Sequence, residues 1–329
     1  MKPMPVILGP TACGKTAVAA RLAFELDGEV ISADSRQVYR GMDIGSGKDL
    51  GDYIVDGHSV PYHLINIAEP GSEYNIFEYQ KDFARVCADI TGRGKLPVLC
   101  GGSGMYLEAV LKGYSLPEAP SDPGFAERMN TLDDASLLAE LGRLKKLHST
   151  TDTVDRSRIL RALEIEMKRR EAGITDDAGV SISHEPHQEG EAGRSGGVKM
   201  RATWNLHHVI FGLNPGRETV RQRITTRLQS RLENGMIGEV RSLIDRGIPP
   251  ERLKAYGLEY KYITLYLGGE LSYDEMFRLL NISIHQFAKR QVTWFRRMER
   301  QGMQIHWIEG EMPSAGKVKK IREILESNV

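Results

Sequence analysis

The sequence predicts an α/β fold, in which a parallel sheet is flanked by helices and carries an inserted, mainly helical subdomain. Short apolar runs alternate with helix-like segments through the first third of the chain, and each run is followed by a turn. This alternation is typical of parallel strands joined by crossover helices. Because parallel strands end at one edge of their sheet, we expect the functional loops at that edge.

The expected elements follow one another in a regular order. The expected strands are residues 5–8, 29–32 and 96–100, and the expected helices between them are residues 15–26 and 77–91. A further strand is expected at residues 207–212, because this run precedes Asn214-Pro215-Gly216 and a helix that starts at Arg217. The α/β body therefore resumes late in the chain, and the remainder is expected to be mostly helical.

A different pattern separates the two parts of this body. Residues 121–170 are helical and charged without a strand signal, and residues 181–198 are rich in Gly, Glu and His. We therefore expect a core made of residues 1–116 and 203–329. Residues 117–202 are expected to form a helical insertion that ends in a flexible segment.

Composition excludes several classes of protein. The chain has 329 residues, 40% of them hydrophobic, and 44 basic residues balance 44 acidic ones. Any binding of nucleic acid must therefore come from local basic patches. Three cysteines lack the spacing of a metal site or a disulfide framework, and no apolar stretch is long enough for a membrane span. We expect a cytoplasmic monomer without a membrane partner.

The strongest motif is Gly9-Pro10-Thr11-Ala12-Cys13-Gly14-Lys15-Thr16, which matches G-x-x-x-x-G-K-[ST] between an expected strand and an expected helix. It predicts a P-loop, as in P-loop NTPases, whose backbone N–H groups surround phosphate oxygens. Lys15 adds a positive charge, and the Thr16 hydroxyl can bind Mg²⁺. ATP, GTP or a prenyl diphosphate would satisfy these groups equally, and a chance glycine turn is the alternative.

Asp34 stands at the tip of the strand that follows the phosphate-loop helix. There a carboxylate could bind a water on Mg²⁺ or accept a proton from a nucleophile. The alternative is an aspartate that caps the backbone N–H groups of a turn.

Two glycine-rich loops lie near the same edge. The segment from Gly41 to Lys48 is interpreted as a mobile loop that carries a cation, with a surface role for Lys48 as the alternative. Gly101-Gly102-Ser103-Gly104 follows the third strand, where missing side chains permit close approach of a substrate or simply a tight turn.

Together these motifs resemble the tRNA dimethylallyltransferase family. The matching segments are Gly9 to Thr16, Asp34-Ser-Arg-Gln-Val-Tyr39, Gly41-Met-Asp-Ile-Gly45 with Lys48, Gly101 to Gly104, and Ala288-Lys-Arg-Gln-Val-Thr-Trp-Phe-Arg296. Their order and spacing span nearly the whole chain. The resemblance implies transfer of a dimethylallyl group from dimethylallyl diphosphate to N6 of adenosine 37, beside the anticodon of tRNA, with Mg²⁺ as cofactor. It also implies that Asp34 is the general base.

The chain departs from the family pattern at a few positions. Cys13 replaces the usual serine of the loop, and Ser103 replaces the usual threonine. Gly257-Leu-Glu-Tyr260 stands where the family commonly shows an Ile-Gly-Tyr run. The last departure indicates a divergent branch, in which the tRNA subset or the acceptor differs.

Arginines accompany the helix that starts at Arg217. Its apolar stripe is Val220, Ile224, Leu228 and Leu232, flanked by Arg223, Arg227 and Arg231. Arg217 and Arg221 fall on the inward stripe, where a buried arginine needs an anion, either a diphosphate or a core carboxylate. The resemblance favours Arg217 as a catalytic ligand of the diphosphate.

Basic residues also mark possible contacts with tRNA. Residues 284–300 are amphipathic, and their basic face could track phosphates or be an ordinary solvated surface. Ser157 stands where the family usually has glutamine. With the resemblance, the residues expected to contact tRNA are Asp34, Ser35, Arg36, Gln37, Ser103, Ser157, Arg158, Arg161, Lys289 and Arg290.

The expected reaction is an alkyl transfer, in which the adenine amine attacks C1 of the dimethylallyl group while diphosphate leaves. The phosphate loop, Mg²⁺ on Thr16 and Arg217 would stabilise the developing charge, while Asp34 takes the proton. A small-molecule or nucleoside kinase that uses ATP is the first alternative. A prenyltransferase acting on free adenine nucleotides and an RNA-binding paralogue without turnover are the others.

Overall fold

The computed structural model describes residues 2–113, 122–144, 156–171 and 207–328. They fall into two compact units, one made of Met1–Tyr114 with Thr203–Val329 and the other of Ser115–Ala202. Each unit has its own hydrophobic core, so each is described by itself. The flexible segment expected at residues 181–198 lies outside the described residues.

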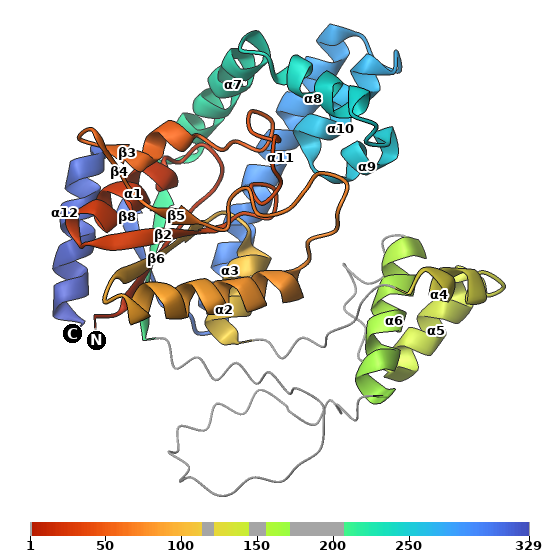
Figure 1. Cartoon of the computed structure of the whole chain (residues 1–329), viewed down its shortest axis with the longest axis horizontal. Helices are drawn as coiled ribbons and strands as arrows, with labels where there is room; N and C mark the ends of the chain where they lie inside the picture. The colour runs from red at the N-terminus through yellow and green to blue at the C-terminus, as the bar shows by residue number, and fades with distance from the viewer. Residues whose placement is uncertain (1, 114–121, 145–155, 172–206, 329) are drawn as a thin grey trace, which may run out of the picture. The chain divides into compact units, whose positions relative to one another are not determined.

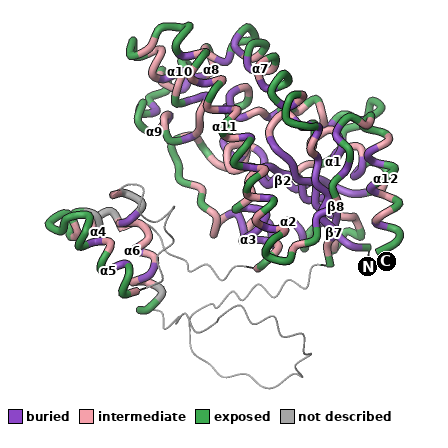
Figure 2. The backbone as a smooth tube through the Cα atoms, turned by 180° about the vertical axis from the view of Figure 1, so that it is seen from behind, coloured by how far each residue is buried: buried purple, intermediate pink, exposed green. Residues whose placement is uncertain are grey.

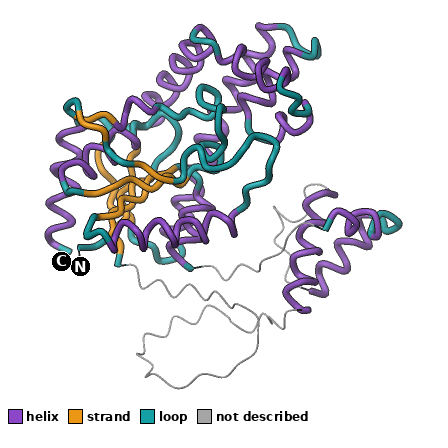
Figure 3. The backbone as a smooth tube through the Cα atoms, in the orientation of Figure 1, coloured by secondary structure: helices purple, strands orange, loops and turns teal. Residues whose placement is uncertain are grey.

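The first unit is built on a parallel sheet, as the sequence predicts (Figures 1 and 3). In spatial order its strands are β5 (Tyr62–His63), β2 (Gly28–Ala33), β6 (Leu96–Gly101), β1 (Met4–Leu8), β7 (His208–Asn214) and β8 (Ile305–Glu309). Leu8 pairs with Gly101 and with Gly212, and Ala33 also pairs with Gly101. The three central strands β1, β2 and β6 therefore end level with one another, and the loops that follow them meet.

Helices cover both faces of this sheet, and the strands between them are buried (Figure 2). On one face lie α1 (Lys15–Glu25), α12 (Ser314–Ser327) and the short helix η1 (Leu50–Tyr53), beside the hairpin β3 (Ile54–Val55) and β4 (His58–Ser59). On the other face lie α2 (Ile76–Gly92), α3 (Gly104–Lys112) and the end of α11 (Tyr273–Arg300). Two apolar layers thus hold the sheet, and its carboxyl edge is left for chemistry.

A separate helical layer packs against the loop that follows β2. Its helices are α7 (Arg217–Glu233), α8 (Met236–Asp245), α9 (Pro250–Ala255), α10 (Leu258–Leu267) and the first half of α11. Val38 and Met42 of the loop are fully buried in this layer. Because α11 contributes Ile284 here and Phe295 to the sheet core, one long helix joins the two regions.

The second unit is helical in its described part. It consists of α4 (Pro123–Arg128), α5 (Asp134–Leu144) and α6 (Arg156–Glu171). Phe125, Leu137, Leu141, Ile159 and Leu163 form a small core among them.

The sequence interpretation misses the edges of the sheet. β8 lies in a stretch that the sequence predicts to be mostly helical, and among the described strands it pairs only with β7. β5 is two residues long, too short for an alternating pattern. In the described parts of the chain, no helix combines the length and apolar character needed to cross a membrane.

Candidate active site

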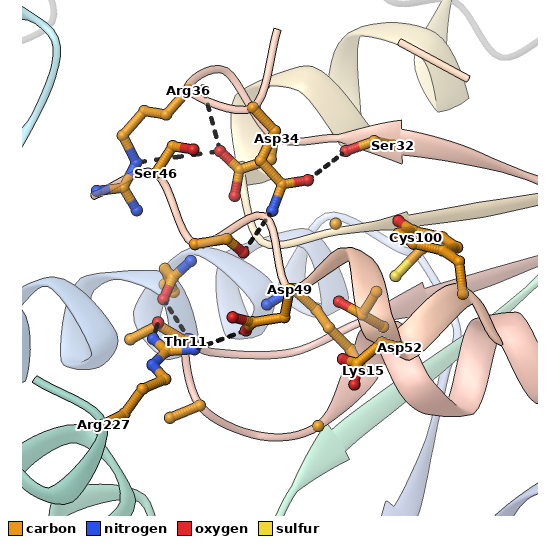
Figure 4. A pocket seen from close by; sticks show the side chains of 18 of the residues that line it. Thr11, Lys15, Ser32, Asp34, Arg36, Ser46, Asp49, Asp52, Cys100 and Arg227 are labelled. Carbon is orange, nitrogen blue, oxygen red and sulfur yellow. Dashed lines mark hydrogen bonds and ion pairs between the residues drawn. The ribbon is translucent and has the colours of Figure 1, made fainter. Parts of the chain in front are cut away.

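A cleft lies at the carboxyl edge of the sheet, where the loops after β1, β2 and β6 meet (Figure 4). It encloses about 710 Å³, part of it open to solvent. Side chains from these loops and from α7, α10 and α11 line it. Lys15, Asp34 and Arg227 come from three of these segments and surround one space, so the parallel topology collects groups that are far apart in sequence.

The phosphate loop turns tightly between β1 and α1. Gly14, with φ of 81°, and Ala12, with φ of 61°, both adopt left-handed conformations. A Cβ atom on Gly9 would lie 2.6 Å from the carbonyl oxygen of Leu213, so the close approach of β7 requires glycine there. α1 begins at Lys15, and the free N–H groups of its first turn favour an anion at this end.

Most of the motif faces the cleft. Of the expected diphosphate-binding residues, those that line the cleft are Thr11, Ala12, Gly14, Lys15 and Thr16. Cys13, which replaces the family's serine, is buried in the core beneath Gly9. Lys15 Nζ donates to the carbonyl of Pro10 at 3.4 Å. Because Cys13 is buried in the core, its sulfur is directed away from any ligand of the loop.

Gln291 of α11 ties the phosphate loop to the loop after β6. Its Oε1 accepts the backbone N–H of Thr11 at 2.8 Å, and its Nε2 donates to the carbonyl of Gly102 at 2.8 Å. A Cβ atom on Gly102 would lie 2.5 Å from that nitrogen, so this loop needs glycine for the contact. Gln291 belongs to the segment Ala288–Arg296 that resembles the family, but the sequence analysis gives it no role, although a polar residue on the buried face of an amphipathic helix is a signal for one.

Two arginines of α7 face the phosphate loop. Arg227 donates to the hydroxyl of Thr11, and Arg231 Nη2 donates to both carboxylate oxygens of Asp49, at 2.8 and 3.0 Å. Burial, together with the neighbouring cation of Arg231, lowers the pKa of Arg227 to about 10. In the free protein, the carboxylate of Asp49 partly balances these two cations. Its Oδ2 lies 3.9 Å from Arg227 Nη1. An anion with more negative charge than Asp49 would therefore stabilise the two arginines further.

The expected burial of Arg217 and Arg221 is wrong. Both residues are exposed, and neither lines the cleft. The buried positions of α7, which are Val220, Ile224, Leu228 and Leu232, repeat every four residues, so the buried stripe drifts around the helix and leaves both arginines outside it. The arginines that face the phosphate loop lie about three turns later, at positions that the sequence pattern placed beside the apolar stripe.

Asp34 has both of the properties considered from sequence. Its Oδ1 accepts the backbone N–H of Arg36 at 3.0 Å and so caps the turn after β2. The side chain also lines the cleft with Lys15 and Thr16. Its Oδ2 has no hydrogen bond within the described part of the chain, so one carboxylate oxygen is available to a ligand.

The residues beside Asp34 are bound mainly to the protein. The N–H of Ser35 donates to Ser103 Oγ at 3.2 Å, which joins the loops after β2 and β6. Gln37 Oε1 accepts from Ser32 Oγ at 3.0 Å, and its Nε2 donates to the carbonyl of Gly47 at 3.1 Å. These side chains therefore shape the cleft whatever else they contact.

The loop from Gly41 to Lys48 is held in place rather than mobile. Glu239 of α8 accepts the N–H groups of Asp43, Ile44 and Gly45 at 2.7 to 3.0 Å. The Lys48 side chain is fully buried, where its ammonium binds Asp43 at 2.8 Å and two further oxygens. Lys48 is therefore neither a surface lysine nor a ligand-binding cation, and the interpretation of this loop as mobile is wrong.

Hard oxygen ligands for a metal gather at the same place. Thr16 lines the cleft, as do Asp49 and Asp52. Burial, together with the carboxylate of Asp49, raises the pKa of Asp52. No group of three or more His, Cys, Asp or Glu side chains in the described residues is arranged to hold a metal alone. A Mg²⁺ ion would therefore need oxygens from a bound diphosphate or water in addition.

The basic face predicted on residues 284–300 is confirmed by burial. Lys289, Arg290 and Arg296 are exposed on α11, whereas Ile284 and Phe295 are buried on its opposite face. In the second unit, Arg161 binds Glu164 at 2.6 Å. Ser157 and Arg158 lie in α6, and their side chains fall outside the described residues.

Family models and relatives match nearly the whole chain. A model described as IPP transferase matches residues 37–298, and one described as Isopentenyl transferase matches residues 3–57. The tRNA dimethylallyltransferase 2 of Phocaeicola vulgatus is 48% identical over 321 residues, which cover 98% of this chain and 97% of that protein. The tRNA dimethylallyltransferase 1 of Parabacteroides distasonis is 49% identical over 323 residues, with 98% and 97% coverage.

Solved structures share the fold. The full-length tRNA isopentenylpyrophosphate transferase of Bacillus halodurans is 28% identical with a TM-score of 0.67, covering 100% of this chain and 97% of that one. A eukaryotic dimethylallyltransferase acting on tRNA also has a TM-score of 0.67, at 20% identity, and covers 94% of this chain and 74% of that chain.

Proposed function

The chain belongs to the IPP transferase family of tRNA dimethylallyltransferases, and on that premise we propose that it transfers a dimethylallyl group from dimethylallyl diphosphate to N6 of adenosine 37 in tRNA. The observation that carries the proposal is that the phosphate loop and Asp34 line one cleft. A leaving group that carries phosphates and a proton acceptor are the two things that this alkylation needs. A kinase would use the same two groups, so it is the family match, rather than this pair, that favours alkyl transfer over phosphoryl transfer.

The diphosphate binds at the phosphate loop in this proposal. The N–H groups at the start of α1, the Lys15 ammonium and the guanidinium groups of Arg227 and Arg231 provide the positive charge. Because negative charge grows on the diphosphate as it departs, donors already held in place stabilise the transition state more than the substrate. In this proposal Arg227 and Arg231 take the role that the family resemblance implies for Arg217.

The residues present fit a Mg²⁺ ion beside that diphosphate. The Thr16 hydroxyl would bind it directly, and the carboxylates of Asp49 and Asp52 would bind it or its water. When bound, the ion would offset the charge of the departing diphosphate. The raised pKa of Asp52 supports this, because the nearby cation of Arg227 does not offset the burial of this carboxylate and its repulsion by Asp49, so a further cation would stabilise its charged form.

Asp34 is the proton acceptor in this proposal. The N6 nitrogen forms a bond to C1 of the dimethylallyl group, while the bond between C1 and the diphosphate oxygen breaks and its electron pair leaves with the diphosphate. The nitrogen then loses a proton to Oδ2 of Asp34, the oxygen without a partner in the described structure. The adenine must be unstacked from the anticodon loop to reach this cleft.

The tRNA is bound by local basic surfaces in this proposal, because the chain as a whole has no net charge. Lys289, Arg290 and Arg296 on the exposed face of α11 would contact phosphates. The helical insertion would hold the anticodon stem-loop through Arg158 and Arg161.

The test is transfer of label from radioactive dimethylallyl diphosphate, with Mg²⁺, to unmodified tRNA, to AMP or to no acceptor. We expect label in tRNA, absent with Asp34→Asn and absent from tRNA in which adenosine 37 is replaced by guanosine. Label in AMP alone would move the acceptor to free nucleotides. Turnover of ATP without transfer would identify a kinase.

A further inference from the structure

Arg36 is largely buried between three groups. Its Nη1 donates to Glu259 Oε2 at 2.8 Å, and its guanidinium lies 5.1 Å from the centre of the Phe287 ring. A Cβ atom on Gly257 would lie 2.8 Å from Arg36 Cδ, so the arginine passes where only glycine leaves room. The orientation of this side chain is therefore determined from several sides.

The same arginine lies beside the proposed base without binding it closely. Its Nε is 4.0 Å from Asp34 Oδ1, too far for a hydrogen bond, and only its backbone N–H binds that oxygen. Burial would lower the pKa of Arg36, but the carboxylates of Glu259 and Asp34 outweigh it and raise that pKa. The guanidinium is thus permanently charged and shared unequally between two carboxylates.

This arrangement avoids an unfavourable alternative. A guanidinium that bound Asp34 through two N–H groups would hold both carboxylate oxygens and make the carboxylate a weaker base. Glu259 has a side chain only 8% exposed and stands in the first turn of α10, where the free N–H groups of the helix favour a negative charge. Glu259 therefore competes with Asp34 for the guanidinium of Arg36.

We propose that Glu259 is a positioning residue for the reaction: it holds the Arg36 guanidinium away from Asp34, so that the base keeps a free oxygen for the adenine amine. This inference rests on the proposed function, in which Asp34 takes the proton. It also gives a role to the Gly257–Tyr260 departure from the family pattern. That stretch supplies both the glycine that admits Arg36 and the carboxylate that binds it.

Other ionisable groups near Asp34 do not provide this control. Burial raises the pKa of Cys100 in β6 to about 12, and burial also raises the pKa values of three tyrosines, so all four groups stay neutral; the tyrosines are Tyr53 in η1, Tyr79 in α2 and Tyr106 in α3. Within the described residues, Arg36 is the basic side chain found within 4.0 Å of Asp34. On the other side of the pair, Glu259 also interacts through space with Arg227.

The test measures the pH dependence of kcat in two single variants. In Glu259→Gln the released guanidinium closes on Asp34, so we expect kcat to fall about tenfold or more and the acid limb to move about one unit to lower pH. In Arg36→Met the cation is lost and the apolar stem is kept, so the acid limb should move to higher pH. Because Glu259 also interacts with Arg227, the KM for dimethylallyl diphosphate should change in Glu259→Gln, but by a smaller factor than kcat.

If the two single variants move the acid limb in opposite directions, Glu259 acts by positioning Arg36. Damage to the fold would instead leave the acid limb at its wild-type pH. Glu69→Gln is the matched control, since it removes a carboxylate from the exposed pair with Arg40. If either single variant is too unstable, the Arg36→Met/Glu259→Gln double variant, which leaves no unpaired charge, should have its acid limb above that of the wild type.

The result that would overturn the inference is an unchanged acid limb in these variants, with kcat falling only as melting temperature falls. Failure of the proposed function looks different. In that case the wild type would not label tRNA, or Asp34→Asn would keep its activity.

Discussion

At the scale of single residues, Arg227 carries a positive charge that its place in the cleft disfavours. Burial and the neighbouring Arg231 lower its pKa to about 10, which means that both disfavour the charged form of Arg227 in the free protein. We expect Arg227→Met to weaken the binding of dimethylallyl diphosphate about 30- to 100-fold, the loss of one charge-assisted contact. The free variant should be as stable as the wild type or more so, because a buried repulsion is removed.

Calorimetric titration with inorganic diphosphate and thermal melting check both parts of this prediction. Arg241→Met, an exposed arginine on α8, is the control for loss of charge alone. Arg217→Met tests the expectation from sequence. A loss of affinity in that variant, with Arg227→Met unaffected, would reverse the assignment.

The carboxylate of Glu29 in β2 is a second charge whose contacts should determine the stability of the fold in acid. The hydrogen bonds of Arg93, and then those of His63, lower the pKa of Glu29 to about 2 from 4.5. A carboxyl with a lowered pKa stabilises the fold above the unfolded value and loses that effect as pH falls through the folded value. Glu29 should therefore contribute roughly 2–3 kcal/mol at pH 7, lost between about pH 4.5 and pH 2.

Urea unfolding of wild type and Glu29→Gln from pH 7 to pH 2 measures this contribution. The difference between the two free energies of unfolding should shrink towards zero at the acid end. The exposed residue Glu251 provides a control, since Glu251→Gln should change stability little at any pH. A difference that stays constant with pH would show that Glu29 acts through packing alone.

Sequence could identify residues in a contiguous motif and failed for residues brought from elsewhere. Lys15, Thr16 and Asp34 were selected because a strand end and a helix start fix them locally. Arg227, Gln291 and Glu259 line the same cleft, but each depends on how a distant helix packs. Periodicity gave the apolar stripe of α7 and the faces of α11 correctly, but it wrongly placed Arg217 and Arg221 on the inward side of α7. It could not show which turn of each helix would lie against the phosphate loop.

At the scale of elements, α8 holds the loop from Gly41 to Lys48 through a single carboxylate. Glu239 accepts three consecutive N–H groups and the hydroxyl of Tyr260. In Glu239→Ala those donors lose their partner, at a cost of about 1–3 kcal/mol for each one left buried. We expect faster hydrogen exchange at residues 43–47 and a lower kcat, because Gly47 binds Gln37 in the cleft.

Hydrogen exchange followed by mass spectrometry compares this variant with Asp245→Asn, an exposed acid on the same helix. The control should exchange like the wild type. Unchanged exchange at residues 43–47 in Glu239→Ala would mean that the buried Lys48 holds the loop by itself.

Elements with strong local signals were predicted well, and those that depend on distant partners were not. β1, β2, β6 and β7 are apolar runs between turns, and the structure contains all of them within a few residues of the expected bounds. β8 follows a 28-residue helix and is defined by pairing with β7, almost a hundred residues earlier. The fixed conformation of the loop Gly41–Lys48 was missed for the same reason. Its glycine content indicates a flexible backbone, and only the contact with Glu239 of α8 shows that its N–H groups are bound.

At the scale of the whole molecule, the first unit contains every group that the proposal assigns to the diphosphate and to the proton. Its two segments come together where Leu111 and His207 line one hollow, so a short linker can join them without the residues between. We expect a variant with residues 115–202 replaced by a glycine–serine linker to fold on its own core and to bind inorganic diphosphate as the wild type does. It should lose at least about 100-fold in kcat/KM for tRNA, because the proposed contacts of the insertion are gone. Lys289→Glu in the full chain is the companion variant, which should weaken tRNA binding in a salt-dependent way and leave diphosphate binding unchanged. If the shortened protein modified tRNA at the wild-type rate, recognition would belong to the exposed face of α11 and to the cleft, and the insertion would have another task.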